Sequence, residues 1–286
     1  MNSVSVQAPA KVNLYLHVTG RRADGYHLLD SLFVFTEHGD KISVQPSEKL
    51  SFEITGEYAN ALPSNGEGNI VLKAAEMLAA ACGMTPDVKI TLEKNLPVAS
   101  GIGGGSADAA ATLKSLTKLW KLNVSRERLL EIALKLGADV PSCLDSKAVQ
   151  VSGIGDVLTS APAFPPLFVV LVNPNKPVST PAVFKSRAPV FSAPAPFTHD
   201  ETDFDAFIEA LKRRTNDLCE AACRIEPSVS LVLQALEDCP QCRLARMSGS
   251  GGTCFGLFSN AKDALDSCGR IRNAYPQWWL LNTRVA

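Results

Sequence analysis

The stretch Pro97-Val98-Ala99-Ser100-Gly101-Ile102-Gly103-Gly104-Gly105-Ser106-Ala107 places four glycines within five positions, directly before an alanine-rich run. Leu113, Leu116 and Trp120 then recur at helical spacing, so a glycine-rich loop opens a helix here. Residues without a Cβ let the backbone turn tightly and approach a ligand. The first N–H groups of a helix have no internal partner and carry the positive end of its dipole. The stretch therefore predicts an anion site, and phosphate is the commonest biological anion.

The loop belongs to neither of the two best-known phosphate-binding motifs. No Gly-Lys-Ser/Thr follows it, and its glycines do not fit the Gly-x-Gly-x-x-Gly spacing of a dinucleotide site at the start of a chain. Ser106 is placed where its hydroxyl can cap the helix, contact a phosphate oxygen or reach a bound metal. The alternative is a plain linker, which a run of strong helix formers argues against.

Composition indicates a globular protein of about two domains, with 286 residues, 46% hydrophobic and 20% charged. A net charge of −1 gives no electrostatic footprint for nucleic acid or an anionic membrane. The longest apolar runs are strand-sized, and the N-terminus lacks a basic start followed by a long apolar core. We therefore expect a cytoplasmic protein without nucleic-acid or membrane partners, and nothing in the sequence indicates its oligomeric state.

Eight cysteines lie mostly in apolar or helical contexts, without the density of a disulfide scaffold. Free thiols are the expected state. The alternative is a zinc site or a redox pair, because Cys239 and Cys242 have ligand-like spacing and Cys219 and Cys223 fall one helical turn apart. Two cysteines one turn apart are equally typical of core positions.

Periodicity and cap signals predict strands and helices along the rest of the chain. A strand over 4–18 is expected to break at Pro9. Asn69 and Ser125 are typical N-caps, and Gly83 and Gly137 are typical helix stops. Strands are expected at 28–35, 41–44, 50–55 (a hairpin), 88–92, 148–151, 157–158, 167–172, 243–247 and 253–258. Helices are expected at 70–82, 126–136, 204–213, 217–223 and 229–236, with a short one after 178. Residues 160–166 are interpreted as an interdomain linker, and 187–203 as a mobile excursion.

Polar residues elsewhere are candidates for chemistry. Lys11 and Asn13 lie two apart in an expected strand, so they share one face, either functional or solvated. Tyr26 and His27 end a turn-rich loop and suit ring stacking and hydrogen bonding, although a loop histidine is usually solvated. Asp139 follows a helix stop and precedes Pro141, where a carboxylate is either a cap or a working group. The second glycine-rich turn, residues 248–252, is either a tight hairpin or a cover that closes over the phosphate loop from the other domain.

Three separated segments resemble, in order and spacing, the motifs of the GHMP small-molecule kinases: Pro9-Ala10-Lys11-Val12-Asn13-Leu14, residues 97–106, and Met247-Ser248-Gly249-Ser250-Gly251-Gly252. Residues 22–27, 136–141 and 180–184 are similar to the branch of that family that acts on a cytidyl diphosphate polyol. The resemblance spans nearly the whole chain. It implies a two-domain α/β (α+β) GHMP kinase fold, with an N-terminal domain like ribosomal protein S5 domain 2 over 1–160 and a ferredoxin-like C-terminal domain over 161–286.

The same resemblance implies an activity. It is ATP-dependent phosphorylation of the 2-hydroxyl of 4-diphosphocytidyl-2-C-methyl-D-erythritol, giving the 2-phosphate and ADP on the methylerythritol phosphate route to isoprenoid precursors. Mg²⁺ would arrive with the nucleotide, and no protein ligand of the metal is identified. The alternatives are another GHMP kinase, acting on mevalonate, homoserine or a sugar, and a nucleotide-binding protein without catalysis.

Residue roles follow from the resemblance. Asp139 would take or orient the proton of the substrate hydroxyl, and Lys11 would pair with it and neutralise charge on the transferred phosphoryl group. Tyr26 and Phe184 would sandwich the cytosine ring while His27 bonds its edge; Asn13 and Thr180 would touch the polyol and diphosphate. The implied ATP-binding residues are Pro97, Val98, Ala99, Ser100, Gly101, Ile102, Gly103, Gly104, Gly105, Ser106 and Ala107, with Asn69 and Lys94 near the adenine.

The chain departs from the family pattern at two places. Many members have a second serine after the glycines, where this chain has Ala107, so any such hydroxyl role falls to Ser106 or is absent. Val98-Ala99-Ser100 replaces a more glycine-rich run and stiffens the loop entrance. Tyr26, His27 and Phe184 argue against a small polyol or amino acid as substrate, because such a molecule offers no ring to stack.

Overall fold

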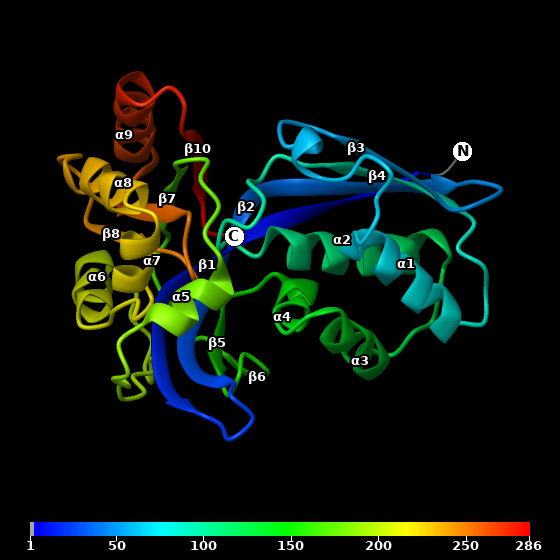
Figure 1. Ribbon diagram of the computed structural model, residues 1–286, viewed down its shortest axis with the longest axis horizontal. Helices are drawn as coiled ribbons and strands as arrows, with labels where there is room; N and C mark the ends of the chain where they lie inside the picture. The colour runs from blue at the N-terminus through cyan, green and yellow to red at the C-terminus, as the bar shows by residue number, and fades with distance from the viewer. Residues whose placement is uncertain (1–2) are drawn as a thin grey trace. The chain divides into compact units, whose positions relative to one another are not determined.

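The computed structural model describes residues 3–286 (Figure 1). The chain divides into two compact units that interleave along the sequence. The first unit contains the described residues through Lys11, then His38–Val98 and Gly103–Lys147; the second contains Val12–Glu37, Ala99–Ile102 and Ala148–Ala286. Residues 160–166, interpreted above as a linker, thus lie within the second unit. A division into family domains at 160/161 stays a prediction.

Two long strands, β1 (Val4–Arg21) and β2 (His27–Pro46), pair with each other and contribute to both units. The predicted break at Pro9 is wrong, and so is the predicted gap between strands at 28–35 and 41–44. Gly39 explains how Pro9 is tolerated, since a Cβ on Gly39 would lie 2.1 Å from the Ala8 carbonyl oxygen and 2.7 Å from Pro9 Cα. The missing side chain at Gly39 lets β2 pass close to the proline.

In the first unit, residues Lys41–Pro46 of β2 pair antiparallel with β4 (Val88–Glu93). The strand predicted at 50–55 is present as β3 (Ser51–Thr55), but it runs parallel to β4 rather than forming a hairpin. The reason is the intervening helix α1 (Ile70–Ala81), since parallel strands need a crossover. A short 3₁₀ turn, Ala59–Ala61, precedes α1.

Four helices of this unit lie on one side of β2, β3 and β4 (Figure 1). Besides α1 they are α2 (Gly104–Leu119), α3 (Arg126–Leu136) and α4 (Val140–Asp145). The cap predictions are confirmed: the Asn69 side chain accepts from the Val71 N–H, the Ser125 side chain from the Arg128 N–H, and Gly137 follows the end of α3. α2 buries Ala109, Ala110, Leu113 and Leu116. The helix that follows the glycine-rich loop is therefore fixed in the core.

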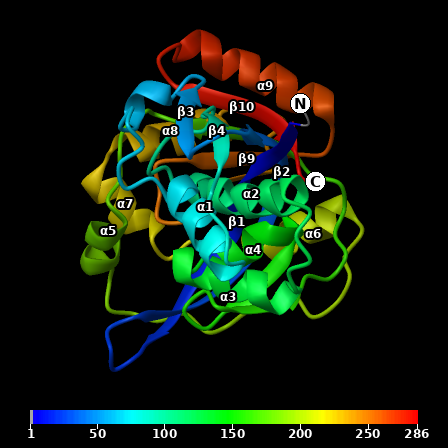
Figure 2. The same cartoon turned by 90° about the vertical axis from the view of Figure 1, so that its right-hand side faces the viewer.

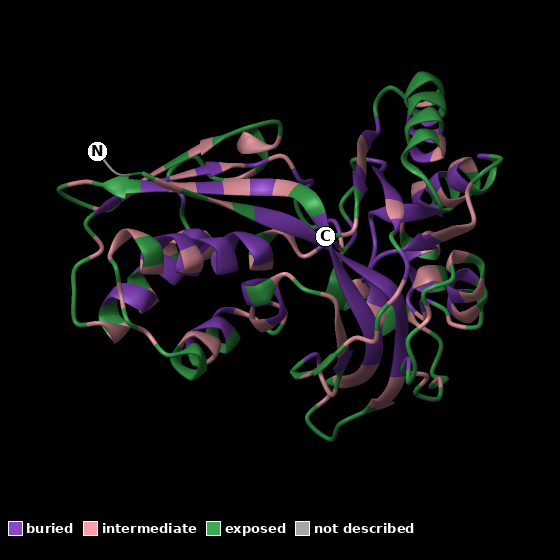
Figure 3. Ribbon diagram, turned by 180° about the vertical axis from the view of Figure 1, so that it is seen from behind, coloured by how far each residue is buried: buried purple, intermediate pink, exposed green. Residues whose placement is uncertain are grey.

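The second unit contains an antiparallel sheet in the order β10-β7-β9-β8. Its strands are β7 (Phe168–Asn173), β8 (Leu244–Met247), β9 (Cys254–Phe258) and β10 (Trp279–Arg284). Five helices belong to the same unit: α5 (Thr180–Ser186), α6 (Phe204–Lys212), α7 (Cys219–Ile225), α8 (Ser228–Glu237) and α9 (Ala261–Ala274). Neither α9 nor β10 was predicted from the sequence; the two lie side by side in Figure 2. Most residues of β7 and β9 are buried, purple in Figure 3, and their side chains contribute to the core of this unit.

Residues Ser31–Phe33 of β2 also pair with β5 (Val149–Ser152), which continues antiparallel into β6 (Val157–Ser160). The nearby segment 187–203 is anchored, contrary to the mobile excursion expected from its composition. Phe197 and Gln150 exchange two hydrogen bonds, with N–H to Oε1 at 2.6 Å and Nε2 to the carbonyl at 2.9 Å. Asp30 accepts from the Ala195 N–H, and the buried Phe197 ring packs 5.3 Å from Phe207. Partners far away in sequence thus fix a segment whose own composition looks flexible.

Within the described residues, each helix is too short or too polar to cross a bilayer.

Candidate active site

The glycine-rich loop enters α2 as predicted, through backbone conformations that favour glycine. Gly103, with φ +65°, is the N-cap of α2 and brings no side-chain cap. Gly101 also has a left-handed φ, +77°. Ser106 is the third residue of α2, so it does not cap the helix. The first N–H groups of α2 therefore point out of the helix with no side chain capping them, as an anion site requires.

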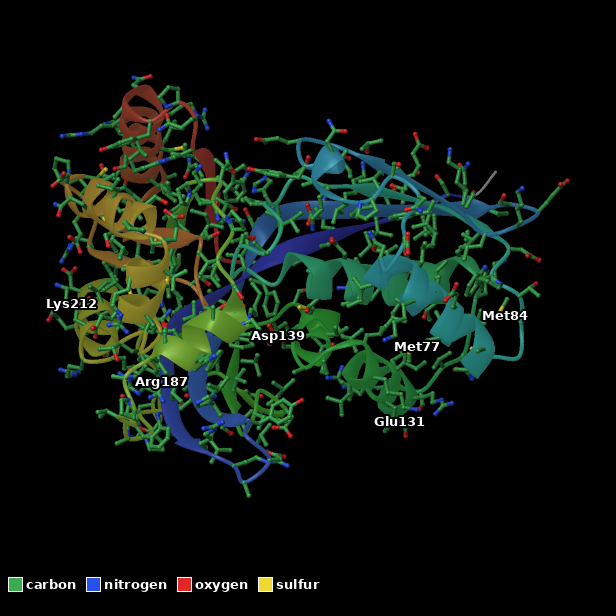
Figure 4. All side chains as sticks on the ribbon, viewed as in Figure 1. Met77, Met84, Glu131, Asp139, Arg187 and Lys212 are labelled. Atoms are coloured by element: carbon green, nitrogen blue, oxygen red, sulfur yellow. The ribbon has the colours of Figure 1, made fainter. Side chains whose placement is uncertain are left out.

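Lys11 lies directly beside this helix start, although it comes from β1. A Cβ on Gly103 would lie 3.1 Å from Lys11 Cβ and 3.2 Å from its Cε, so the lysine stem occupies the space that a side chain there would need. The Lys11 ammonium donates to Asp139 Oδ2 at 2.9 Å. Asp139 precedes α4 and makes no side-chain cap bond to it (Figure 4). Asp139 thus occupies the N-cap position of α4 without capping it through its carboxylate, and its role as a working group stays a prediction.

The two members of this ion pair differ in exposure. The Lys11 side chain is 5% exposed, whereas that of Asp139 is 36% exposed. A ligand can reach the carboxylate while the ammonium stays fixed behind it. α4 holds the main chain of Asp139 in place, because Ser142 donates back to the Asp139 carbonyl at 2.8 Å and Val140 is buried. The arrangement offers a positioned base beside a positive charge and a helix N-terminus.

Lys94 lies behind the same helix start, in a buried charge cluster. Its ammonium donates to Asp40 Oδ2 at 2.6 Å and to Asp108 Oδ2 at 2.7 Å. Asp40 Oδ1 also accepts from the N–H groups of Asn95 and Leu96, which lead into the glycine-rich loop. The cluster thus links the chain before the loop to the helix after it. A place for Lys94 near the adenine stays a prediction, and its 4% exposed side chain already has two carboxylate partners.

Burial raises the pKa of Asp108 to about 7, the neighbouring Lys94 lowers it, and Asp40 raises it. The pKa of Lys94 is also raised, because its two carboxylates outweigh the effect of burial. Asp40 and Asp108 were not among the site residues predicted from the sequence. Asp108 gave a signal that could have found it, since it is a carboxylate within the apolar run of α2, one turn after Gly104.

The second glycine-rich turn, Ser248–Gly252, joins β8 to β9 as the predicted hairpin and also packs on the entrance of the phosphate loop. The Ser248 hydroxyl donates to the Gly101 carbonyl at 3.1 Å, and the Thr253 N–H donates to the Ser100 carbonyl at 3.0 Å. A Cβ on Gly101 would lie 2.6 Å from the Ser248 carbonyl oxygen. The hairpin is therefore confirmed, and the turn contacts the loop entrance within the same unit, so a cover from another domain stays a prediction.

Asn13, two residues beyond Lys11 in β1, is 2% exposed. Its main-chain N–H donates to Ser248 Oγ at 3.1 Å, and its side-chain Nδ2 donates to Ser31 Oγ at 3.0 Å. Its Oδ1 has no hydrogen-bond partner among residues 3–286. No sequence pattern singled out Ser31, and Ser248 was named only as part of the second glycine-rich turn, because the partners of both serines come from distant parts of the chain.

The other four predicted substrate residues line one cavity of about 730 Å³ in the second unit. His27 and Phe184 stack with ring centroids 4.9 Å apart, and Tyr26 is 62% exposed. Thr180 shares a hydrogen bond with Ser250 at 2.6 Å. The remaining lining residues are Arg21, Asp24, Gly25, Leu29, Ile154, Pro181 and Lys185. The structure thus gathers two predicted segments, 22–27 and 180–184, around one space.

Burial lowers the pKa of His27, and the nearby Arg187 and Arg21 lower it further. A neutral imidazole carries one donor and one acceptor nitrogen, which suits the edge of a pyrimidine ring.

All eight cysteines are free thiols, as expected. Cys219 and Cys223 approach each other with sulfurs 4.0 Å apart. Across residues 3–286, no three His, Cys, Asp or Glu side chains are grouped to hold a metal ion. Cys219, Cys223, Cys239 and Cys242 therefore do not form the zinc site considered as the alternative.

Two family models match the chain: the GHMP kinases N-terminal domain over residues 69–147 and the GHMP kinases C-terminal model over residues 199–277. The chain belongs to the GHMP kinases. The N-terminal match contains the glycine-rich loop and Asp139. ATP is the phosphoryl donor in this family.

Full-length relatives narrow the comparison within the GHMP kinases. The chain is 51% identical over 280 residues to 4-diphosphocytidyl-2-C-methyl-D-erythritol kinase of Paramagnetospirillum magneticum, covering 98% of each chain. It is 52% identical over 284 residues to the protein of the same name from Rhodospirillum rubrum, covering 99% of this chain and 93% of that one.

Solved structures agree with this fold. The crystal structure of a 4-(cytidine 5'-diphospho)-2C-methyl-D-erythritol kinase superposes with a TM-score of 0.81 at 33% identity, covering 99% of both chains. A homoserine kinase from Cytophaga hutchinsonii gives a TM-score of 0.75 at 18% identity, covering 100% of this chain and 95% of that one, which shows the fold alone. The predicted family and the predicted mixed α/β, two-domain GHMP kinase fold are confirmed.

Proposed function

We propose that this GHMP kinase transfers the terminal phosphoryl group of ATP to the 2-hydroxyl of 4-diphosphocytidyl-2-C-methyl-D-erythritol, giving the 2-phosphate and ADP. Relatives that are half identical over their whole length carry the name of this kinase. The activity provides an intermediate on the methylerythritol phosphate route to isoprenoid precursors. We place it in the cytoplasm.

One observation supports phosphoryl transfer above all: the Lys11–Asp139 ion pair lies against Gly103, the N-cap of α2. Phosphoryl transfer needs chiefly positioning and charge stabilisation. In the proposed reaction, the main-chain N–H groups of 101–106 hold the phosphates of ATP. Asp139 takes or orients the proton of the attacking hydroxyl, and Lys11 neutralises charge on the phosphoryl group in transit.

Mg²⁺ would enter with the nucleotide, held by phosphate oxygens and water as is usual for this ion, and would supply further charge neutralisation. A helix start without a side-chain cap, beside a partly exposed carboxylate, suits a site where the nucleotide itself carries most of the metal's ligands.

The cavity of Tyr26, His27, Thr180 and Phe184 supports a cytidyl substrate. In the proposed complex the cytosine ring lies between Tyr26 and Phe184, so His27 would have to leave its present stack on Phe184 and turn toward the ring edge. Aromatic stacking contributes about 1–3 kcal/mol per base in nucleic-acid binders, enough to separate a cytidyl substrate from a bare polyol. One mevalonate kinase and one homoserine kinase share the fold at 11% and 18% identity, so they do not favour those substrates here.

The test is coupled ADP release by the purified protein with Mg-ATP and, in parallel, the cytidyl substrate, mevalonate and homoserine. We expect turnover with the cytidyl substrate alone. Asp139→Asn should lose it, while Asp145→Asn, which removes an exposed carboxylate at the other end of α4, should retain it. Turnover on mevalonate or homoserine would overturn the substrate, and ATP binding without any turnover would favour the non-catalytic alternative.

A further inference from the structure

Asn13 is buried but only half satisfied. Its Nδ2 has a partner in Ser31 Oγ, while its Oδ1 has none within the described part of the chain. A buried carbonyl oxygen without a donor is unfavourable, so such a group in a native site needs a donor from outside the chain, such as a ligand. The orientation of the amide depends on the residue that faces its Nδ2 group, Ser31.

The hydrogen bond that Ser31 donates determines which end of the Asn13 amide can face it. The Ser31 hydroxyl donates to the Tyr15 carbonyl at 2.5 Å, and a carbonyl can only accept. The single hydroxyl proton is thereby used, so Ser31 Oγ can only accept from Asn13. Only the NH₂ group of Asn13 can face Ser31, and its carbonyl oxygen must point the other way.

The surroundings make this orientation rigid. Ser31 is fully buried and lies in β2, paired with Val151 of β5. Tyr15, the acceptor, lies in β1 with its side chain fully buried and its hydroxyl bonded to Asp30 at 2.8 Å. The main chain of Asn13 is held by Ser248. Each group that sets the amide is therefore fixed by the sheet or by the glycine-rich turn.

We propose that Ser31 is a positioning residue that turns the Asn13 amide so that Oδ1 accepts a hydrogen bond from a hydroxyl of the polyol substrate. The inference rests on the proposed function, in which Asn13 contacts the polyol. Ser31 does not touch the substrate. It selects a hydroxyl donor over an acceptor at this point of the site, because a flipped amide would present NH₂ instead.

The experiment compares Ser31→Ala with Ser31→Thr in steady-state kinetics. In Ser31→Ala the NH₂ group loses its acceptor and turns toward the substrate, so kcat/KM for the cytidyl polyol should fall roughly tenfold, as for one lost hydrogen bond. KM for ATP should not change. Ser31→Thr keeps the hydroxyl and should recover most of the activity, which a purely structural role for the small side chain would not give.

Deoxy analogues of the polyol, each lacking one hydroxyl, identify the partner. One analogue should lose activity strongly with the wild-type enzyme but little further with Ser31→Ala, because both changes remove the same hydrogen bond. Equal losses in both enzymes for every analogue would overturn the inference, as would unchanged kinetics in Ser31→Ala. Absence of wild-type turnover on the cytidyl polyol would instead count against the proposed function.

A crystal structure of the wild-type complex with the cytidyl polyol keeps the inference testable if Ser31→Ala does not fold. A polyol hydroxyl within hydrogen-bond distance of Asn13 Oδ1, with Nδ2 still on Ser31, would support it. An Asn13 side chain that donates to the substrate would refute it.

Discussion

The Lys94 ammonium donates to Asp108 at 2.7 Å, and Asp108 lies one helical turn beyond Gly104 in α2. Asp40 accepts from the same ammonium at 2.6 Å. Two carboxylates thus share one buried cation beneath the helix start that we propose binds phosphate. Burial, together with the nearby Asp40, raises the pKa of Asp108 to about 7 although Lys94 lowers it.

This relationship predicts a pH dependence of stability. The pKa of Asp108 is raised from 3.8 in the unfolded chain to about 7 by burial. Between these two values the folded protein binds more protons than the unfolded one, so the free energy of unfolding should fall as pH rises from about 4 to 7. Asp108→Asn should flatten that slope in urea unfolding measured across this range. Asp266→Asn, at an exposed position on α9, should retain it. Parallel curves for wild type and Asp108→Asn would contradict the prediction.

Removal of the Lys11 charge should slow the phosphoryl-transfer step. Lys11→Met should lower kcat by roughly 10²–10⁴, the range for groups that handle protons and charge in catalysis. The double variant with Asp139→Asn should be little slower than either single variant, because the two act as a unit. Lys89→Met, at a half-exposed lysine on β4, is the matched control. Additive losses in single-turnover measurements would show that the two residues act separately.

Gly101 should not tolerate a side chain. Gly101→Ala forces a left-handed φ of +77° on alanine, which costs about 1–3 kcal/mol by itself. Its Cβ would also overlap the carbonyl oxygens of Ser248 and Gly251 at 2.6 and 2.7 Å. We expect a lower melting temperature and a higher KM for ATP. Gly269→Ala, where nothing lies within 4 Å of the added Cβ, should be neutral or stabilising. A Gly101→Ala protein as stable as wild type would contradict the backbone contact.

Phe184→Ala should affect the cytidyl substrate alone. Loss of one stacking partner should raise its KM by roughly 5–150-fold, equivalent to about 1–3 kcal/mol. KM for ATP should stay the same. Phe191→Ala removes a half-exposed phenylalanine outside the cavity lining and serves as control. An equal rise in both KM values would indicate a general loss of structure instead.

The structural features that could be predicted from the sequence were those that depend on nearby residues. The caps Asn69 and Ser125 and the glycine-rich start of α2 depend on neighbours within a few residues, and each is present where it was expected. The continuity of β1 through Pro9 depends on Gly39, which lies 30 positions away in the sequence. No local sequence pattern indicates that Pro9 and Gly39 lie next to each other in the sheet.

The residues of the candidate site also fall into those that could be predicted from local motifs and those that could not. The glycine-rich loop and the segment around Asp139 were recognisable as motifs, because the chemistry requires particular residues close together. The partners that orient them were not. Ser31 and Asp108 look like an ordinary strand serine and a helix aspartate until Asn13 and Lys94 are brought beside them.

The interleaving of the two units constrains how the chain can acquire its structure during synthesis. Residues 12–37 belong with 148–286, so the second unit cannot be completed until most of the chain has left the ribosome. The first unit needs residues only through Lys147 and can assemble earlier. During that interval the parts of β1 and β2 that belong to the second unit would pair with each other but lack β5, so the edge of β2 that β5 covers would be exposed. A chaperone that shields extended strands would therefore be most useful to this protein while roughly its last half is being translated.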